Sequence, residues 1–321
     1  MSRKYDYLVP DSLREIFEAT DGPPITVETL PKRRTAMAEL FASLAPPAKP
    51  ARTIQVPTSD EGRTVELRVL EPESRKTDGA IYAIHGGGYV VGTAEMMDNL
   101  NQQLANNIGC VVIAVDYRLA PETPFPGPLQ DCFDGFQYVA ENADALGINA
   151  AKLIIEGESA GGGLAAALCL MCRDRKAHEA VGQALVYPML DHRTATPDDP
   201  DPNPTVAHYS WSRENNVFGW SAMREGYQLD DARIGHFSPA RAADLSGLPP
   251  AFIGTGALDL FLNEDIDYAR RLSIAGVPVE LHVYPGGPHG FQRISDLPAA
   301  RGFRRDHLNA MRSWLGIEPD I

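Results

Sequence analysis

The sequence predicts an α/β protein in which a mostly parallel central sheet is flanked by helices, with further helical segments forming a cap. Two observations support this fold class. Buried-type apolar runs alternate with segments of helical character from about residue 50 onward, and such alternation produces parallel sheets covered on both faces. A β-branched run from Leu153 to Ile155 also passes through a glycine-rich turn into an Ala- and Leu-rich segment, which is typical of strand, tight turn and helix. With 321 residues, 44% of them hydrophobic, the chain can bury a sizeable core.

The net charge of −14, from 29 Lys and Arg against 43 Asp and Glu, argues against nucleic acid and anionic membranes as partners. The segment from Met1 to Phe17 is studded with charge and lacks the apolar stretch of a secretory signal. No later run approaches the ~18 apolar residues of a membrane span. We therefore expect a cytoplasmic protein whose partner is a small molecule.

Four cysteines suit a reducing compartment as small apolar residues. Cys169 and Cys172 form a C-x-x-C, but they lie in an apolar helical run with no second pair and no histidine nearby. A zinc or redox site is therefore the weaker interpretation, and we expect core packing.

From Tyr5 to about Ala45 the apolar pattern predicts two helices interrupted by Gly22-Pro23-Pro24. A stiff linker, Pro46 to Pro50, follows. Residues 1–45 are therefore predicted to form an N-terminal helical cap segment. The apolar faces of the two helices comprise Leu13, Ile16 and Phe17, and Met37, Leu40, Phe41 and Leu44.

The catalytic domain is predicted over residues 46–190 and 236–321. It begins with a hairpin whose turn is Asp60-Glu61-Gly62. Six buried-type strands follow, and the chemistry of such sheets collects at their carboxyl ends. The predicted strands are Thr53–Pro57, Thr64–Leu70, Ala80–His85, Val111–Asp116, Leu153–Gly157, Gln183–Tyr187, Ala251–Thr255 and Val279–Tyr284.

Residues 191–235 interrupt the alternation, and they are rich in Pro, Asp and aromatic side chains. Their length and their position between two strands predict a cap insertion. The candidates for lining a substrate pocket are Tyr89, Tyr187, Tyr209, Trp211 and Phe218.

The pentapeptide Gly157-Glu158-Ser159-Ala160-Gly161 has the G-x-S-x-G spacing of a nucleophile elbow. A serine held in a strained turn brings its neighbours so close to strand and helix that side chains at 157 and 161 would clash. The pentapeptide alone also occurs by chance. A strand before it and a small-residue helix after it favour the catalytic interpretation.

A serine nucleophile needs a histidine base held by an acid. His289 and Asp259 each follow a predicted strand, at the edge of the sheet that carries the elbow, and the order Ser159, Asp259, His289 is that of α/β-hydrolase triads. Other carboxylates, at 264, 265 and 267, fall in the following helical pattern, which carries them away from this edge. We therefore predict Asp259 as the acid.

The segment His85-Gly86-Gly87-Gly88-Tyr89 directly follows a strand and predicts an oxyanion hole formed by the backbone N–H groups of Gly87, Gly88 and Ala160. The alternative is a dinucleotide loop. Its glycine spacing is one residue too long for that fingerprint, and the position about twenty residues on is Asn106 rather than an acid.

In combination, five features of the chain resemble the motifs of the hormone-sensitive-lipase-like (bacterial family IV) group of α/β hydrolases, which includes carboxylesterases of the heroin-esterase type. These features are His85 to Tyr89, Asp116 to Glu122, Gly157 to Gly162, Asp259 and His289. The resemblance implies an α/β-hydrolase fold, a cap over the acyl pocket and no metal or organic cofactor. It also implies that Tyr117 to Glu122 braces the oxyanion loop and the elbow, and that the chain forms a homodimer through its last strand and helix.

One departure from the family pattern concerns the acid segment, where the usual Asp-Pro-Leu-x-Asp-Glu is Asp259-Leu260-Phe261-Leu262-Asn263-Glu264. Phe261 and Leu262 are either pocket wall or the packed start of a helix, and we favour packing. The expected function is a serine carboxylesterase for short-chain esters. The alternatives are an aryl or sugar ester deacetylase, a lactonase or an amidase with the same triad. A non-catalytic receptor of this fold is disfavoured, because such proteins lose the triad histidine.

Overall fold

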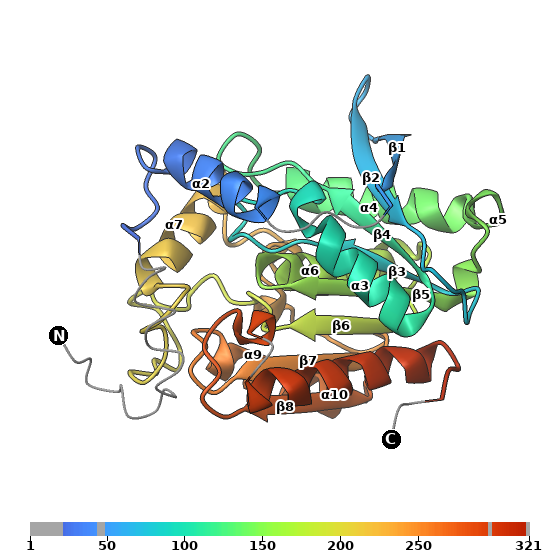
Figure 1. Ribbon diagram of the computed structural model, residues 1–321. Helices are drawn as coiled ribbons and strands as arrows, with labels where there is room; N and C mark the ends of the chain where they lie inside the picture. Colours follow the sequence, from blue (N-terminus) through green and yellow to red (C-terminus); the bar gives the residue numbers. More distant parts are fainter. Residues whose placement is uncertain (1–21, 44–48, 295–296, 319–321) are drawn as a thin grey trace.

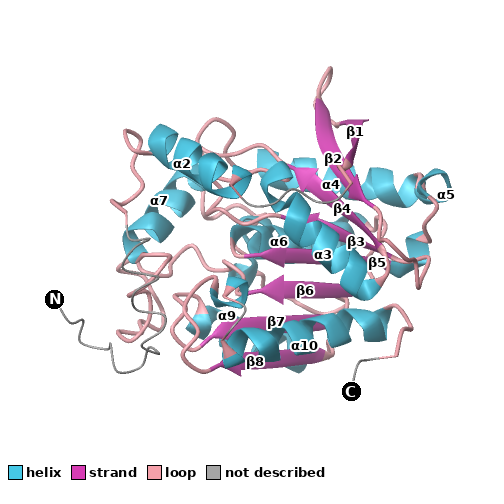
Figure 2. Ribbon diagram, viewed as in Figure 1, coloured by secondary structure: helices cyan, strands magenta, loops and turns pink. Residues whose placement is uncertain are grey.

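Eight strands form one sheet in the computed structural model of the protein, which describes residues 22–43, 49–294 and 297–318 (Figures 1 and 2). The strand order is β1-β2-β4-β3-β5-β6-β7-β8. All eight predicted strands are confirmed, each within one residue at either end. They are β1 Arg52–Pro57, β2 Thr64–Leu70, β3 Ala80–Ile84, β4 Val111–Asp116, β5 Leu153–Glu158, β6 Gly182–Val186, β7 Ala251–Gly256 and β8 Val279–Tyr284.

Parallel pairing brings the functional loops to one edge of the sheet. The predicted hairpin is confirmed as the antiparallel pair β1–β2, and β2 is also antiparallel to β4. All the remaining pairs, from β4 through β3, β5, β6 and β7 to β8, are parallel. The carboxyl ends of these six strands therefore lie at the same edge.

Helices cover both faces of the sheet. Alternate residues of β3 show the two layers, because Ile81 and Ala83 pack in one buried cluster and Tyr82 and Ile84 in another. The first cluster includes residues of α3 and α10, and the second includes residues of α4, α6 and α9. The helices are α2 Leu30–Ala42, α3 Asp98–Ile108, α4 Gly127–Glu141, α5 Ala143–Leu146, α6 Ala160–Arg175, α7 Arg213–Arg224, α8 Ile234–Phe237, α9 Leu262–Ile274 and α10 Pro298–Trp314.

Two helices from the predicted cap segments, α2 and α7, lie beyond the carboxyl ends of the strands (Figure 1). Helix α7 begins after Ser212, whose side chain accepts a hydrogen bond from the backbone N–H of Asn215. Most of the chain from 191 to 212 is loop. The first predicted helix, within residues 1–21, lies outside the described residues.

The apolar face predicted for α2 is wrong in part. Leu40 is 61% exposed, and Leu30 is the helix's buried residue. The reason is that α2 is held through its first turns and through the side chain of Arg34 rather than along an apolar stripe.

Within the described residues, no helix combines the length and apolar character needed to cross a membrane.

Candidate active site

Ser159 occupies a strained turn between β5 and α6. Its φ of 57° and ψ of −122° lie outside the regions that L-residues commonly adopt. A Cβ on Gly157 would lie 2.2 Å from the carbonyl oxygen of Gly161, and one on Gly161 would lie 2.1 Å from that of Ile84. Both glycines are therefore required by close backbone approach, as the sequence predicted. The backbone N–H of Ser159 donates to the carbonyl of Val186 at 2.9 Å, which ties the elbow to β6.

The structure brings Ser159, His289 and Asp259 together. His289 Nε2 lies 3.0 Å from Ser159 Oγ, and its Nδ1 lies 2.9 Å from Asp259 Oδ2. The carboxylate of Asp259 is fully buried, and its other oxygen accepts the backbone N–H of Phe261 at 3.0 Å. Asp259 follows β7 and His289 follows β8, so parallel pairing delivers both to the edge that carries the serine.

The three glycines after β3 lie against the elbow. A Cβ on Gly86 would be 3.3 Å from Ser159 Cβ. Gly87 and Gly88 have φ values of +127° and +59°, which glycine adopts without strain. The backbone N–H groups of Gly87, Gly88 and Ala160 donate no hydrogen bond to any described residue. Three donors beside the serine are therefore available to a ligand.

The glycine loop is braced by Tyr117, within the segment to which the family resemblance gives this role. The Tyr117 hydroxyl donates to the carbonyl of His85 at 2.9 Å, and the two rings stack at a centroid distance of 4.2 Å. Burial raises the pKa of Tyr117 well above its usual range, so the hydroxyl stays protonated and donates.

A second brace, which the sequence did not reveal, comes from Arg34 of α2. Its Nε donates to the carbonyl of Val90 at 2.8 Å, and its Nη2 donates to that of Ala120 at 3.1 Å. Both guanidinium nitrogens Nη1 and Nη2 also contact the Glu122 carboxylate, at 2.6 and 2.8 Å. Helix α2 is thereby fastened to the glycine loop. No sequence signal distinguishes this arginine from a solvated one.

Glu158 connects the elbow to the histidine loop, and its partners were also missed. It forms an ion pair with Arg293 and accepts hydrogen bonds from Tyr187 Oη at 3.2 Å and Gln292 Nε2 at 3.1 Å. Burial, and then the Glu158 carboxylate, raise the pKa of Tyr187 well above its usual range. Because Glu158 precedes Ser159 and Arg293 follows His289 by four residues, this contact links nucleophile and base.

Among the predicted pocket residues, Trp211 and Tyr187 lie near the triad. Their ring centroids are 6.3 and 4.5 Å from that of His289. Trp211 also covers the glycine loop, because a Cβ on Gly88 would lie 2.2 Å from its ring. Phe261 is fully buried, with its ring edge-on to His289 at 5.3 Å, so the favoured packing interpretation agrees with its position.

The other three aromatic candidates are placed in packing. Tyr89 is 2% exposed, its ring meets Trp220 edge-to-face, and its hydroxyl donates to the carbonyl of Met189. Tyr209 is buried in a cluster with Tyr187 and Phe291. Phe218 packs against a cluster that includes Ile25, Leu30 and Val90. Burial and these contacts place the Tyr89 side chain in packing against α7 and the chain after β6 rather than on an open surface.

The competing carboxylates have other surroundings. Glu264 accepts the backbone N–H of Leu190 at 2.6 Å, and burial raises its pKa well above the usual range. Asp265 is fully buried on α9, and its pKa is raised by burial and by the carboxyl groups of Glu264 and Asp259. Neither hydrogen-bonds to His289.

Cys169 and Cys172 lie buried in α6, which confirms core packing. Burial raises the pKa of the Cys172 thiol to about 12. Within the described ranges, no cluster of three or more His, Cys, Asp or Glu residues is arranged to hold a metal ion.

Comparison with known proteins gives consistent similarities. A family model described as the α/β hydrolase fold matches residues 81–293, a span that contains Ser159, Asp259 and His289. Ethyl acetate hydrolase of Pseudomonas putida is 32% identical over 246 residues, 75% of each chain. An arylesterase of Saccharolobus solfataricus is 32% identical over 286 residues, 82% of this chain and 86% of that protein. Among solved structures, a bacterial heroin esterase gives a TM-score of 0.86 at 33% identity, covering 96% of this chain and 98% of that one.

Proposed function

Since the chain belongs to the α/β hydrolase family and to the hormone-sensitive-lipase-like group that its motifs resemble, we propose that it is a serine carboxylesterase that hydrolyses short-chain carboxylic esters. One observation carries the proposal. The unbroken hydrogen-bond chain from Ser159 Oγ through His289 to Asp259 lies beside the unpaired N–H groups of the glycine loop.

The mechanism follows from this geometry. His289 Nε2 takes the Ser159 proton as Oγ attacks the ester carbonyl, and Asp259 holds the imidazole through Nδ1–H and stabilises its charged form. The N–H groups of Gly87, Gly88 and Ala160 receive the oxyanion. His289 then gives the proton to the departing alcohol, which leaves an acyl group on Ser159. Water, deprotonated by His289, attacks this acyl-enzyme and releases the acid.

Substrate size is argued from the cap. Trp211 and α7 lie directly on the glycine loop, since a Cβ on Gly219 would meet the carbonyl oxygen of Gly88 at 2.6 Å. These contacts close the site on the side of the glycine loop, which favours acyl groups of about two to six carbons. The names of the relatives, an ethyl acetate hydrolase and an arylesterase, support an ester substrate. Aryl or sugar ester deacetylation, lactone opening and amide cleavage use the same machinery and remain the alternatives.

The test is hydrolysis of p-nitrophenyl esters from acetate to palmitate by the wild-type protein and by Ser159→Ala. Activity is expected to peak at short acyl chains and to vanish in Ser159→Ala, together with labelling by a fluorophosphonate probe. Retained labelling of the variant would refute the role of Ser159. A maximum at twelve or more carbons would refute the short-chain preference.

Three further parts of the proposal concern organisation. Residues 1–45 and 191–235 act as the cap over the domain formed by 46–190 and 236–321, which the positions of α2 and α7 support. A homodimer through β8 and α10 is supported by apolar exposure on the edge strand β8, where Leu281 and Val283 are 37% and 40% exposed. Light scattering after gel filtration tests the dimer. A cytoplasmic location is supported by the four cysteines, which are all buried and free, as suits a reducing compartment.

A further inference from the structure

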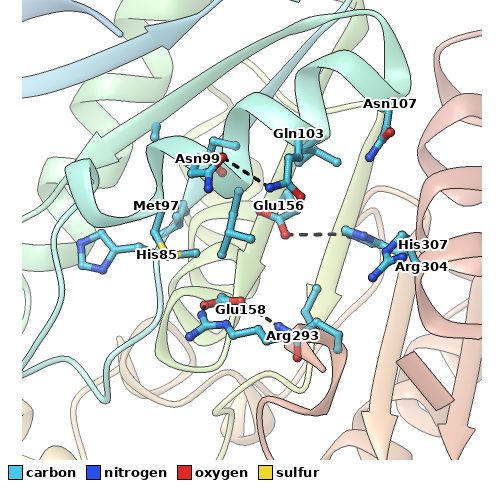
Figure 3. Close-up of a pocket in the computed structure, with 18 of the residues that line it drawn as sticks. His85, Met97, Asn99, Gln103, Asn107, Glu156, Glu158, Arg293, Arg304 and His307 are labelled. Atoms are coloured by element: carbon cyan, nitrogen blue, oxygen red, sulfur yellow. Dashed lines mark hydrogen bonds and ion pairs between the residues drawn. The ribbon is translucent and has the colours of Figure 1, made fainter. Parts of the chain in front are cut away.

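A second pocket lies on the face of the sheet between α3 and α10, with a volume of about 560 Å³ (Figure 3). Its floor includes small side chains of the sheet, Ala83 and Ala114, and its walls include Leu104 of α3 and Leu308 of α10. Neither Ser159 nor His289 lines it. The volume is within the range of small-molecule sites, roughly 300–1,000 Å³.

The polar end of this pocket holds two side chains without partners. His307 of α10 is 7% exposed, and its Nε2 has no hydrogen-bond partner among the described residues. Glu156 of β5 has a side chain 13% exposed, and its Oε1 lies 3.9 Å from that same Nε2. This distance is too long for a hydrogen bond. Figure 3 shows the two side chains facing each other from the sheet and from α10. Buried polar groups in native proteins are normally paired, so this end of the pocket needs a partner.

Burial disfavours the charged form of both groups. Burial, and then the nearby Glu158 carboxylate, raise the pKa of Glu156 to about 8. Burial lowers the pKa of His307 to about 4. The Glu158 carboxylate at the other end of the pocket is neutralised by Arg293, so no unpaired buried charge calls for an ionic ligand.

A hydroxyl group fits this end. An oxygen atom about 2.8 Å from both polar atoms, themselves 3.9 Å apart, subtends an angle of about 90° between them. Such an oxygen accepts a hydrogen bond from the protonated Glu156 and donates one to His307 Nε2. The leucine side chains and Phe303 then cover an apolar body.

We propose that the pocket between α3 and α10 binds an uncharged alcohol or phenol with a ring-sized apolar body, its hydroxyl seated between Glu156 and His307. An esterase releases an alcohol of this chemical class, so the ligand of the pocket can be the product of the reaction. Only this identification of the ligand with the product rests on the proposed function. The opposite end of the pocket reaches Glu158, Gln292 and Arg293, which join the elbow to the histidine loop.

The test is binding of 2-naphthol at pH 7, measured by the fluorescence anisotropy of the naphthol. The Ser159→Ala protein is used so that the result does not depend on catalysis. We expect saturable binding. Glu156→Leu and His307→Phe each remove one hydrogen-bonding group and are expected to weaken it by ~tenfold or more. Glu156→Gln keeps a donor and an acceptor and is expected to stay within about threefold of the parent. Leu104→Phe, which fills the pocket without touching its polar end, is expected to weaken binding equally.

Two controls separate this site from the catalytic one. Trp211→Ala, beside His289, is expected to leave naphthol affinity unchanged. The proposal would be overturned if Trp211→Ala lost binding while Leu104→Phe and Glu156→Leu kept the parent's affinity. It would also be overturned if naphthol did not bind at all, and water would then be the occupant of the pocket. The cation 1-naphthylmethylammonium is expected to bind at least ~tenfold more weakly than naphthol, because it requires Glu156 to ionise in a buried site. Equal or tighter binding of the cation would refute the uncharged class.

Discussion

Replacing Asp259 by Asn tests the proposed triad most sharply, because both oxygens of this carboxylate have defined partners. One oxygen faces His289 Nδ1 at 2.9 Å, and the other accepts the Phe261 N–H at 3.0 Å. If the amide NH₂ of Asn faces His289, the imidazole must carry its proton on Nε2 and cannot accept the one from Ser159. If the amide oxygen faces His289 instead, the NH₂ opposes the Phe261 N–H, and two buried donors meet.

That second orientation costs about 1–3 kcal/mol, which lowers the productive fraction by roughly 5- to 150-fold at 1.4 kcal/mol per decade. Loss of the negative charge beside the imidazolium adds to this, and the same change in a serine protease costs ~10⁴-fold. We therefore expect kcat for p-nitrophenyl butyrate to fall by between ~10² and ~10⁴ in Asp259→Asn.

Asp265→Asn is the matched control. Asp265 is equally buried, and burial raises its pKa well above the usual range, but it does not hydrogen-bond to His289, and Asn preserves its shape. We expect less than about a fivefold change in kcat. A loss in Asp265→Asn as large as that in Asp259→Asn, or a loss below about tenfold in Asp259→Asn, would refute the assignment of the acid.

Three other substitutions probe the surroundings of the site. In urea titrations, Arg34→Ala is expected to lower the free energy of unfolding by about 1–3 kcal/mol, because it leaves two carbonyl groups without their hydrogen bonds. The control Arg33→Ala should lower it by less than about 0.5 kcal/mol. Equal effects of the two substitutions would contradict the bracing role of Arg34. Gly161→Ala should abolish activity or folding, because the added Cβ would lie 2.1 Å from the carbonyl oxygen of Ile84. The control Gly302→Ala should be tolerated, because its Cβ would lie 3.4 Å from the nearest atom of Tyr284. An active Gly161→Ala protein would refute the elbow geometry. Glu156→Gln should gain stability relative to wild type as the pH rises from 5 to 9, by up to about 4 kcal/mol. The reason is that the unfolded chain loses the Glu156 proton at about pH 4.3 and the folded protein only at about 8, so wild-type stability falls between these two values and levels off above the second. A pH-independent difference in unfolding free energy would show that Glu156 ionises normally.

The sequence predicted those parts of the fold that are encoded locally. Apolar runs of strand length marked all eight strands, and the glycines at 157 and 161 marked the elbow, because close backbone approach restricts the residue type directly. Parallel pairing then placed Asp259 and His289 without any knowledge of side-chain packing. These inferences needed only chain order and periodicity.

The long-range polar contacts were beyond such reasoning. Arg34 reaches acceptors 56 and 86 residues away, and the contact of Glu158 with Arg293 spans 135 residues. Such contacts have no period and no fixed spacing, so each arginine resembles any surface arginine. For the same reason, the partnerless pair of Glu156 and His307 was not foreseen, because strand β5 and helix α10 bring the two side chains together only in the folded protein.

The slender attachment of α2 has a consequence for the order in which the protein loses structure. Leu30 is the only buried residue of α2, so detachment of this helix exposes far less apolar surface than unfolding of the sheet does. Each detachment also withdraws Arg34 from the carbonyl of Val90, which follows the glycine loop, and from that of Ala120, whose N–H donates to the Tyr89 carbonyl of the loop. Backbone amides of residues 30–42 should therefore exchange with deuterium long before those of α6, and amides around Val90 should exchange together with them. In mild urea, catalytic activity should decline with this local opening, at a concentration where the sheet is still protected.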